Sequence, residues 1–286
     1  MALIPPYWYP NNKENQLEFC ILMNKGEQIM SEKVSGIFVD DDGAGSVPVI
    51  FIHSLAGNTR QWSAQLDHIR KTRRAIALDL RGHGQSAAPA NGDYAIEAMA
   101  QDIRTVVDQS GVERFVLVGH SMGGSVAGAY AGAHPEQVAG LLLADPSGDS
   151  TQMPVEEIQQ LLGALESEAY SNVVEGYWSQ ILTGSTETTE AKVMQDLHDT
   201  SKATVVGVFK ELFKYNPVPA LERYDGPKLS LITSVNETPF SVHNLVSDLP
   251  HKKITGTGHW LQLDKPEEFN RTMDDFLGSI GNGSLH

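Results

Sequence analysis

Short apolar runs along the chain alternate with segments in which apolar residues recur at helical spacing. Four runs are dense in Val, Ile, Leu and Phe, as strands buried on both faces require, and they span 48–53, 74–79, 115–118 and 138–144. Helical spacing separates them, most clearly at 94–107, where Ile96, Met99 and Ile103 share one face. Strands that alternate with helices predict an α/β fold with a mostly parallel, doubly wound sheet, which binds ligands at the carboxyl ends of its strands.

This alternation stops after residue 146. Segments with helical spacing then follow one another without a strand pattern, at 154–165, 170–181, 190–198 and 202–215. Strand patterns return at 229–234 and 253–255, and 266–277 predicts a closing helix. We therefore expect an inserted helical lid over 148–224 that stands over the active edge of the sheet.

The lid divides the rest of the chain into two parts of one core, at 30–147 and 225–280. Residues 30–40 predict a pair of strands. Residues 1–29 show no sustained period beyond a short apolar patch from Phe19 to Met23, and we expect them to be an N-terminal extension. Residues 281–286 resemble a remnant of cloning and are left out of the fold.

A nucleophile elbow is predicted directly after the strand pattern at 115–118. The motif Gly119-His-Ser-Met-Gly123 follows, and then a helix start crowded with Gly and Ala. Gly119 and Gly123 leave room where a larger side chain would clash, so that the Ser121 hydroxyl stands at the apex of a strand, turn and helix. Ser121 is the expected nucleophile.

The serine needs a base, because its hydroxyl is a poor nucleophile at neutral pH. His259 lies in Gly256-Thr-Gly-His-Trp260, directly after the last strand pattern and therefore at the same sheet edge as Ser121. Most other histidines fall on predicted helix surfaces or ends, or beside a strand with no glycine to position them. His259 is the expected base.

The imidazole in turn needs a carboxylate, which sets its tautomer and stabilises its cation. Glu237 is the only acid in Val235-Asn-Glu-Thr-Pro-Phe240, immediately after the strand pattern at 229–234. Asp145 is the alternative, although an acid before proline more commonly serves a turn or a helix cap. The sequence favours Glu237 and leaves Asp145 open.

Two backbone amides are expected to stabilise the oxyanion that forms on the attacked carbonyl. The Met122 N–H, at the start of the elbow helix, is one donor. The Leu55 N–H is the other, in the loop His53-Ser-Leu-Ala-Gly-Asn58 after the first apolar strand. This chemistry requires no cofactor and no metal.

Charge and cysteine content restrict the binding partners and the cross-links that can be expected of this protein. The 286 residues carry 21 Lys and Arg against 36 Asp and Glu, a formal net charge of −15. This charge opposes nucleic acid and anionic membrane surfaces, because binding to either begins by neutralising phosphate. The single Cys20 excludes an internal disulfide framework. Without a membrane-length apolar run or a secretion signal, we expect a cytoplasmic protein, and its oligomeric state stays open.

Four blocks, in this order and spacing, resemble the α/β-hydrolase superfamily, in the short-lid branch that includes esterases and lactonases. They are His53-Ser-Leu-Ala-Gly57, Asp79-Leu-Arg-Gly-His-Gly-Gln-Ser86, Gly119-His-Ser-Met-Gly-Gly124 and Gly258-His-Trp-Leu-Gln-Leu-Asp-Lys-Pro-Glu-Glu-Phe269. The resemblance covers about 33–280. It implies a serine hydrolase that cleaves a small-molecule carboxylic ester or lactone through an acyl-enzyme.

Three positions refine this resemblance. Ser54 stands where the family usually has Gly, which looks like some enol-lactonases and puts a hydroxyl at the expected site. The segment around Glu237 is similar to that of acyl-homoserine lactonases of this fold, which supports Glu237 as the acid. Haloalkane dehalogenases and epoxide hydrolases carry Asp where this chain has Ser121, which argues against those activities.

Substrate choice is expected to lie in the lid. Trp178, Phe209 and Phe213 are candidate lining residues of an acyl pocket, and Trp260 is a further candidate contact beside the base. Two other interpretations stay open. One is a hydrolase of carbon–carbon bonds in ring-cleavage products, although such enzymes often carry Asn where this chain has His120. The other is a ligand receptor on the same scaffold with little turnover.

Overall fold

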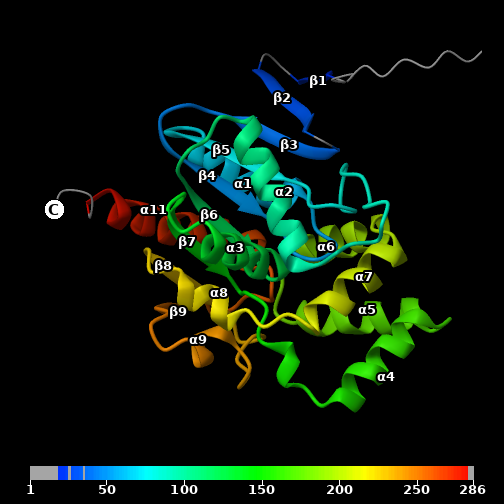
Figure 1. The fold of residues 1–286 in the computed structure, drawn as a ribbon. Coiled ribbons are helices and arrows are strands. Elements are labelled where there is room, and N and C mark those ends of the chain that lie inside the picture. Colours follow the sequence, from blue (N-terminus) through cyan, green and yellow to red (C-terminus); the bar gives the residue numbers. More distant parts are fainter. Residues whose placement is uncertain (1–18, 25–26, 35, 283–286) are drawn as a thin grey trace, which may run out of the picture.

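A mixed β-sheet runs through the molecule and is covered by helices on both faces (Figure 1). The computed structural model describes residues 19–24, 27–34 and 36–282. In this part of the chain, nine strands pair in the order β1-β2-β3-β5-β4-β6-β7-β8-β9. The parallel strands are β4 (Ser46–Ile52), β5 (Arg73–Leu78), β6 (Phe115–His120), β7 (Val138–Ala144), β8 (Lys228–Ile232) and β9 (His251–Lys253).

Three antiparallel strands extend one edge of this sheet. They are β1 (Phe19–Asn24), β2 (Glu27–Val34) and β3 (Ile37–Asp42), and β3 also pairs antiparallel with β5. β2 and β3 form the expected strand pair. β1 adds a strand inside the segment expected to be an extension, because the apolar patch from Phe19 pairs with β2. Residues 1–18 of that extension and 283–286 of the expected cloning remnant lie outside the described residues.

Helices cover the sheet in two groups. α2 (Ile96–Gln109) and α3 (Met122–Ala133) pack on one face, while α1 (Ser63–Ile69) and α11 (Pro266–Asn282) pack on the other. β4 shows the alternation that this requires: Ile50 and Ile52 join the core beneath α2 and α3, whereas Val49 and Phe51 join the core beneath α1 and α11. The central strands are therefore apolar throughout, as the sequence predicts.

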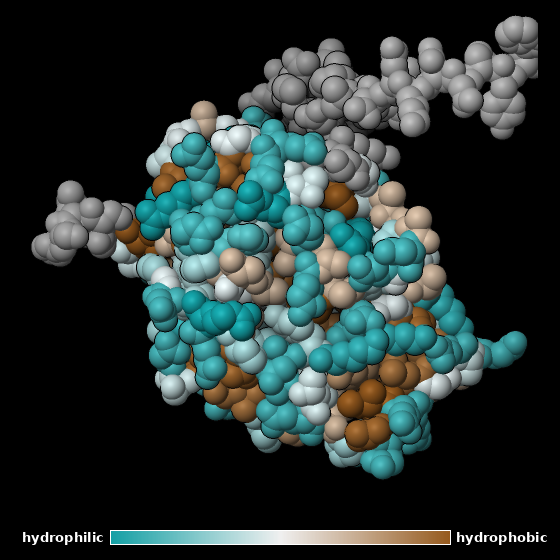
Figure 2. Space-filling model, viewed as in Figure 1, coloured by the Kyte–Doolittle hydropathy of each residue, from teal (hydrophilic) through white to brown (hydrophobic). Residues whose placement is uncertain are grey.

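Only helices are described between β7 and β8. They are η2 (Ser150–Gln152), α4 (Val155–Glu166), α5 (Tyr170–Ile181), α6 (Glu187–Asp199), α7 (Lys202–Leu212) and α8 (Val218–Arg223). Figure 1 shows α4 to α7 gathered at one side of the molecule, whereas α8 packs against α3. Apolar residues are visible on that side over α4 and α5 (Figure 2). We call residues 150–223 the helical insertion.

Three short helices were not predicted from the sequence. α8, α9 (Val242–Leu245) and α10 (Leu261–Asp264) span four to six residues each. A segment of one or two turns shows too little of the 3.6-residue period to be distinguished from a loop. Within the described residues, no helix is both long and apolar enough to cross a membrane.

Candidate active site

Ser121 occupies a strained turn between β6 and α3. Its backbone lies at φ 53° and ψ −120°, a region that non-glycine residues rarely adopt. The two flanking glycines are required by close approach: a Cβ at Gly119 would lie 2.3 Å from the Gly123 carbonyl oxygen, and one at Gly123 would lie 2.4 Å from that of His53. The structure thus forms the strand, turn and helix predicted for the elbow.

Neighbouring strands hold this turn in place. The Ser121 N–H donates to the Ala144 carbonyl at the end of β7, at 3.0 Å. Its own carbonyl accepts from Gly124 N–H at 2.8 Å and from Ser147 N–H at 3.2 Å. Hydrogen bonds from both sides over-determine the conformation, which is the condition under which such strain persists.

His259 lies on the loop between β9 and α10, and its side chain is 10% exposed. Its Nδ1–H donates to Asp145 Oδ2 at 2.5 Å, which leaves Nε2 as the nitrogen that can accept a proton. Its backbone N–H donates to the Ile181 carbonyl of α5 at 3.0 Å. The insertion therefore helps to fix the loop that carries the imidazole.

His120 supports His259 from behind. The two ring centroids are 4.7 Å apart, and His120 Nε2–H donates to the His259 carbonyl at 2.9 Å. Burial holds the pKa of His120 well below its usual range, and the nearby His259 lowers it further. His120 is therefore neutral, and it serves to hold the backbone of His259.

The acid in contact with His259 is Asp145, which follows β7 and is fully buried. Besides His259 Nδ1–H, its carboxylate accepts from the Thr233 N–H at 2.7 Å and the Thr233 hydroxyl at 2.8 Å. Because β7 and β8 are paired, the residues that follow them meet at one edge of the sheet. Charge-assisted hydrogen bonds of this kind stabilise a carboxylate that burial would otherwise penalise.

The preference for Glu237 is wrong. Its Oε2 lies 2.7 Å from Lys253 Nζ, and its side chain is 48% exposed. The loop after β8 folds back instead, since Asn236 donates to the Pro146 carbonyl and Ser241 donates to the Asn236 carbonyl. In the sequence Asp145 directly follows the apolar strand at 138–144, but Glu237 also follows a strand pattern, so this position did not discriminate between them.

The loop after β4, residues 53–58, lies against the elbow. A Cβ at Gly123 would also meet the Ile52 carbonyl, at 2.6 Å, so the end of β4 touches the start of α3. Among the described residues, no hydrogen-bond partner is found for the Leu55 N–H or the Met122 N–H. The first amide of a helix has no acceptor within its own helix, which leaves that of Met122 available to a ligand. Both stay predicted oxyanion donors.

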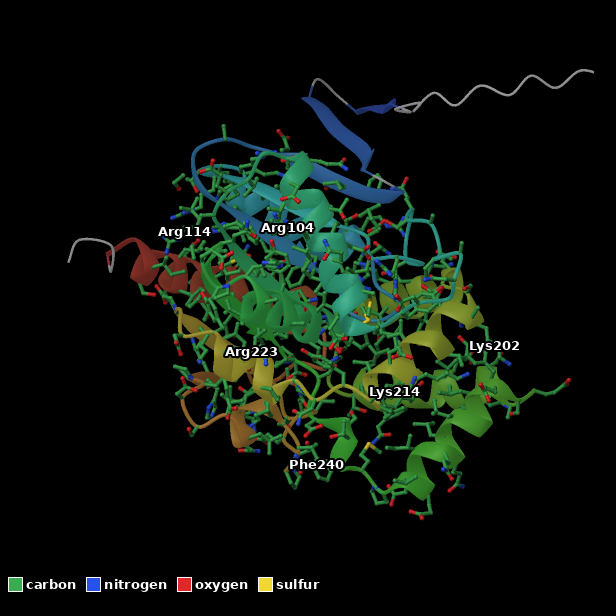
Figure 3. The ribbon with its side chains drawn as sticks, in the orientation of Figure 1. Arg104, Arg114, Lys202, Lys214, Arg223 and Phe240 are labelled. Carbon is green, nitrogen blue, oxygen red and sulfur yellow. The ribbon has the colours of Figure 1, made fainter. Side chains whose placement is uncertain are left out.

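Ser121 and His259 line one cavity of about 640 Å³. Strand ends and their loops contribute Ser121, Ser147, Gly148, Ser234, Val235, Asn236, Thr238, Phe240, Thr257 and His259. The insertion contributes Ser150, Met153, Leu161, Tyr177, Gln180, Ile181, Thr183, Phe209, Leu212 and Phe213. Phe240, on the loop after β8, is labelled in Figure 3 near the lower edge of the molecule. The cavity thus places hydroxyl and imidazole under a largely apolar cover.

Two of the five predicted substrate contacts, Phe209 and Phe213, line this cavity. The other three do not, and these predictions are wrong. Trp178 is 2% exposed and packs behind Phe209, because it lies on the inner face of α5. Trp260 is 1% exposed, with its ring against His120. Ser54 directs its hydroxyl to Gln61 Oε1 at 3.3 Å.

The lining residues that sequence reasoning did not single out come mainly from loops. Ser147, Asn236 and Phe240 follow β7 and β8, and a loop gives no period from which the direction of its side chains could be predicted. For metals, the described residues contain no group of three His, Cys, Asp or Glu side chains arranged to hold an ion.

Three buried histidines should make folding stability depend on pH. Burial lowers the pKa of His53 to about 4 and of His83 to about 3, and that of His120 lies well below its usual value. In the unfolded chain each titrates near 6.5, so unfolding takes up protons below that pH. We expect the unfolding free energy to be fully present above about pH 7 and to fall by roughly 3 kcal/mol between pH 6.5 and 5.5.

Urea unfolding at several pH values would measure this. A His120→Gln variant removes one of the three groups and should reduce the slope by about a third. An unfolding free energy that stays constant from pH 7 to 5.5 would contradict the prediction.

Comparison with known proteins agrees with the fold. A family model described as alpha/beta hydrolase fold matches residues 47–266. The chain is 30% identical over 258 residues to the sn-1-specific diacylglycerol lipase ABHD11 of Mus musculus, which covers 82% of this chain and 83% of that protein. Among solved structures, Est816, described as an N-acyl homoserine lactone degrading enzyme, is 26% identical with a TM-score of 0.71, over 90% of this chain and all of that one.

The esterase EaEST from Exiguobacterium antarcticum shares the fold, with a TM-score of 0.75 at 23% identity, over 87% of this chain and 96% of that one. The sheet order, the strand–turn–helix at Ser121 and the family match all indicate an α/β-hydrolase fold. The chain belongs to the α/β-hydrolase family.

Proposed function

We propose that the protein is a serine hydrolase that cleaves an uncharged carboxylic ester or lactone. Ser121 is the nucleophile, His259 the general base and acid, and Asp145 the carboxylate that orients His259. The observation that carries the proposal is the position of His259, which binds the buried Asp145 and lines the same cavity as Ser121.

The reaction follows from these roles. His259 Nε2 takes the hydroxyl proton as Ser121 Oγ attacks the carbonyl carbon, and the Leu55 and Met122 amides stabilise the oxyanion. When the tetrahedral intermediate collapses, His259 gives its proton to the departing alkoxide and the acyl group stays on Ser121. A water molecule then loses a proton to His259 and attacks the acyl-enzyme, which releases the acid and restores the serine.

We further propose that the helical insertion, within the predicted range 148–224, acts as a lid over this site. Its apolar lining residues include Leu161 of α4, Phe209 of α7 and Phe213 just after α7, and they line the same cavity as the sheet loops. An acyl chain placed against them would leave water. The lid thereby supplies the apolar part of substrate binding.

The charge of the cavity favours an uncharged substrate. Among its described lining residues there is no Asp, Glu, Lys or Arg. Figure 3 labels Lys202 at the start of α7 and Lys214 just beyond its end, and neither lines the cavity. An anionic substrate would lose its hydration without gaining a cationic partner, and the net charge of −15 would repel it.

This argument separates the two enzyme interpretations. Acids formed by oxidative ring cleavage carry a carboxylate, for which the described lining residues of this cavity offer no Lys or Arg. Diacylglycerol and N-acyl homoserine lactone, the compounds named for the ABHD11 lipase and for Est816, are uncharged. An ester or lactone hydrolase is therefore the better account of the site.

A matched pair of esters tests the proposed function. We expect the protein to hydrolyse p-nitrophenyl 6-methylheptanoate and to show a kcat/KM at least about 10-fold lower for mono-p-nitrophenyl adipate, in which a carboxylate replaces the terminal isopropyl group. Steady-state release of p-nitrophenol measures both. Equal rates would refute the preference for uncharged substrates, and no turnover of these esters or of a panel of lactones would refute the hydrolase.

A further inference from the structure

A buried carboxylate of α6 contacts the loop that is expected to stabilise the oxyanion. Asp196 has a side chain that is 3% exposed, although it lies in the helical insertion. Its Oδ1 accepts from Asn58 Nδ2 at 2.8 Å, and its Oδ2 accepts from Gln61 Nε2 at 2.9 Å. The Arg60 guanidinium approaches Oδ1 at 3.4 Å. All three partners follow β4, at the end of the loop that contains Leu55.

The contact continues from Gln61 toward Leu55. Gln61 Oε1 accepts from the Ser54 hydroxyl at 3.3 Å. The same oxygen would lie 2.5 Å from a Cβ built at Gly57, so the Gln61 amide packs directly against the turn. Asp196 is thus joined through one side chain to Ser54, which precedes the predicted oxyanion donor Leu55.

The turn that these contacts support is strained. Ala56 lies at φ 56°, in the left-handed region, and Gly57 N–H donates to the Ser54 carbonyl at 2.9 Å. A non-glycine residue keeps such a conformation only when its surroundings enforce it. Both oxygens of Asp196 are engaged by side chains that adjoin this turn, Asn58 and Gln61.

The core fixes the two ends of the same loop. His53 Nδ1–H donates to the Ser54 carbonyl at 2.7 Å, and His53 Nε2 accepts from Leu80 N–H at 2.9 Å. At the other end, the Thr59 N–H donates to Asp79 Oδ1 at 2.7 Å. Asp196 adds a contact from an element outside the core, at the end of the loop and at Gln61, whose side chain reaches back to Ser54.

We propose that Asp196 is a positioning residue, through which the insertion holds the Leu55 amide in place for the oxyanion. This inference rests on the proposed function. Because the oxyanion exists only in the transition state and the tetrahedral intermediates, a displaced donor lowers kcat and leaves substrate binding nearly unchanged.

Asp196→Asn is the variant that tests this. The two nearest partners of Asp196 are amide NH₂ groups, whereas asparagine offers a single acceptor oxygen and directs its own NH₂ at one of them. We expect kcat for p-nitrophenyl butyrate to fall about 10- to 100-fold, with KM changed by less than about twofold. Affinity for an alkyl trifluoromethyl ketone, whose adduct with serine carries the oxyanion, should fall in proportion to kcat.

Asp199→Asn on the same helix is the matched control. Asp199 is exposed and accepts from Gln195 of its own helix at 2.9 Å, so its loss should leave kcat unchanged. A Gln61→Met variant provides the second test, because it removes the contact to Asp196 at similar side-chain length. If both residues act through one contact, the double variant should lose little more activity than the more damaging single variant.

A purely structural role would give another result. If Asp196→Asn lowers Tm while kcat per folded molecule stays at the wild-type value, or if the losses of the Asp196 and Gln61 variants multiply, the positioning role is wrong. Failure of the proposed function itself would appear separately, as equal turnover by wild type and Ser121→Ala in the same assay.

Discussion

Ser121→Ala is expected to reduce kcat for p-nitrophenyl butyrate by about 10⁶-fold, to the limit of detection. The variant removes the oxygen that carries the acyl group in the proposed reaction, so His259 and the predicted oxyanion donors have no nucleophile to assist. Binding should change little, because a single oxygen is lost from a cavity of about 640 Å³. Isothermal titration of the variant and of wild type with a non-reactive substrate analogue would measure the retained affinity.

Ser125→Ala is the control for this variant. Ser125 lies one turn further along α3, is 3% exposed, and does not line the cavity. It therefore matches the chemical change at a buried site of the same helix and should keep the wild-type rate. Comparable turnover by Ser121→Ala and wild type would rule out the acyl-enzyme.

The second large effect is expected at the acid. Asp145→Asn should lower kcat by about 10⁴-fold, because an amide NH₂ facing His259 Nδ1 forces the ring to carry its proton on Nε2. That tautomer cannot accept the Ser121 proton. The Thr233 N–H still has an oxygen to donate to, so we expect the fold to persist in this variant.

Glu237→Gln is the comparison that decides between the two acids. Its carboxylate is half exposed and pairs with Lys253, and a surface pair of this kind contributes about 0 to 1 kcal/mol to stability. We expect its kcat to stay within about twofold of wild type. A larger loss of kcat at Glu237 than at Asp145 would reverse the assignment of the acid. Melting curves of both variants would show whether either loss reflects unfolding.

These predictions differ in how far the sequence alone supports them. Ser121 and His259 each lie beside a strand pattern and in a glycine-containing turn, so local sequence was enough to select them. The sequence was less able to identify the acid, because Asp145 and Glu237 both follow strands that end at the same edge of the sheet. The fold of the loop after β8, in which Asn236 donates to the Pro146 carbonyl, decides that Glu237 points to solvent.

The same limit applies to the substrate contacts. The helical period located α5 and α7 correctly, and it predicted aromatic residues near the cavity. It could not state which face of α5 meets the cavity and which meets the core. Trp178 is buried behind Phe209, while Tyr177 lines the cavity, although the two residues are adjacent in sequence.

By itself, the sequence determined the alternation of strands and helices, the position of the elbow and the place of the insertion, because burial on two faces, helical period and close glycine contacts each leave a local pattern. The tertiary structure alone decided that Asp145 meets His259, that the described residues lining the cavity include no Asp, Glu, Lys or Arg, and that Asp196 reaches the loop of Leu55. Asp145 and His259, like Asp196 and its partners Asn58 and Gln61, are more than a hundred positions apart in the sequence. Their contacts depend on how the strands and helices pack and not on the residues next to them in the chain.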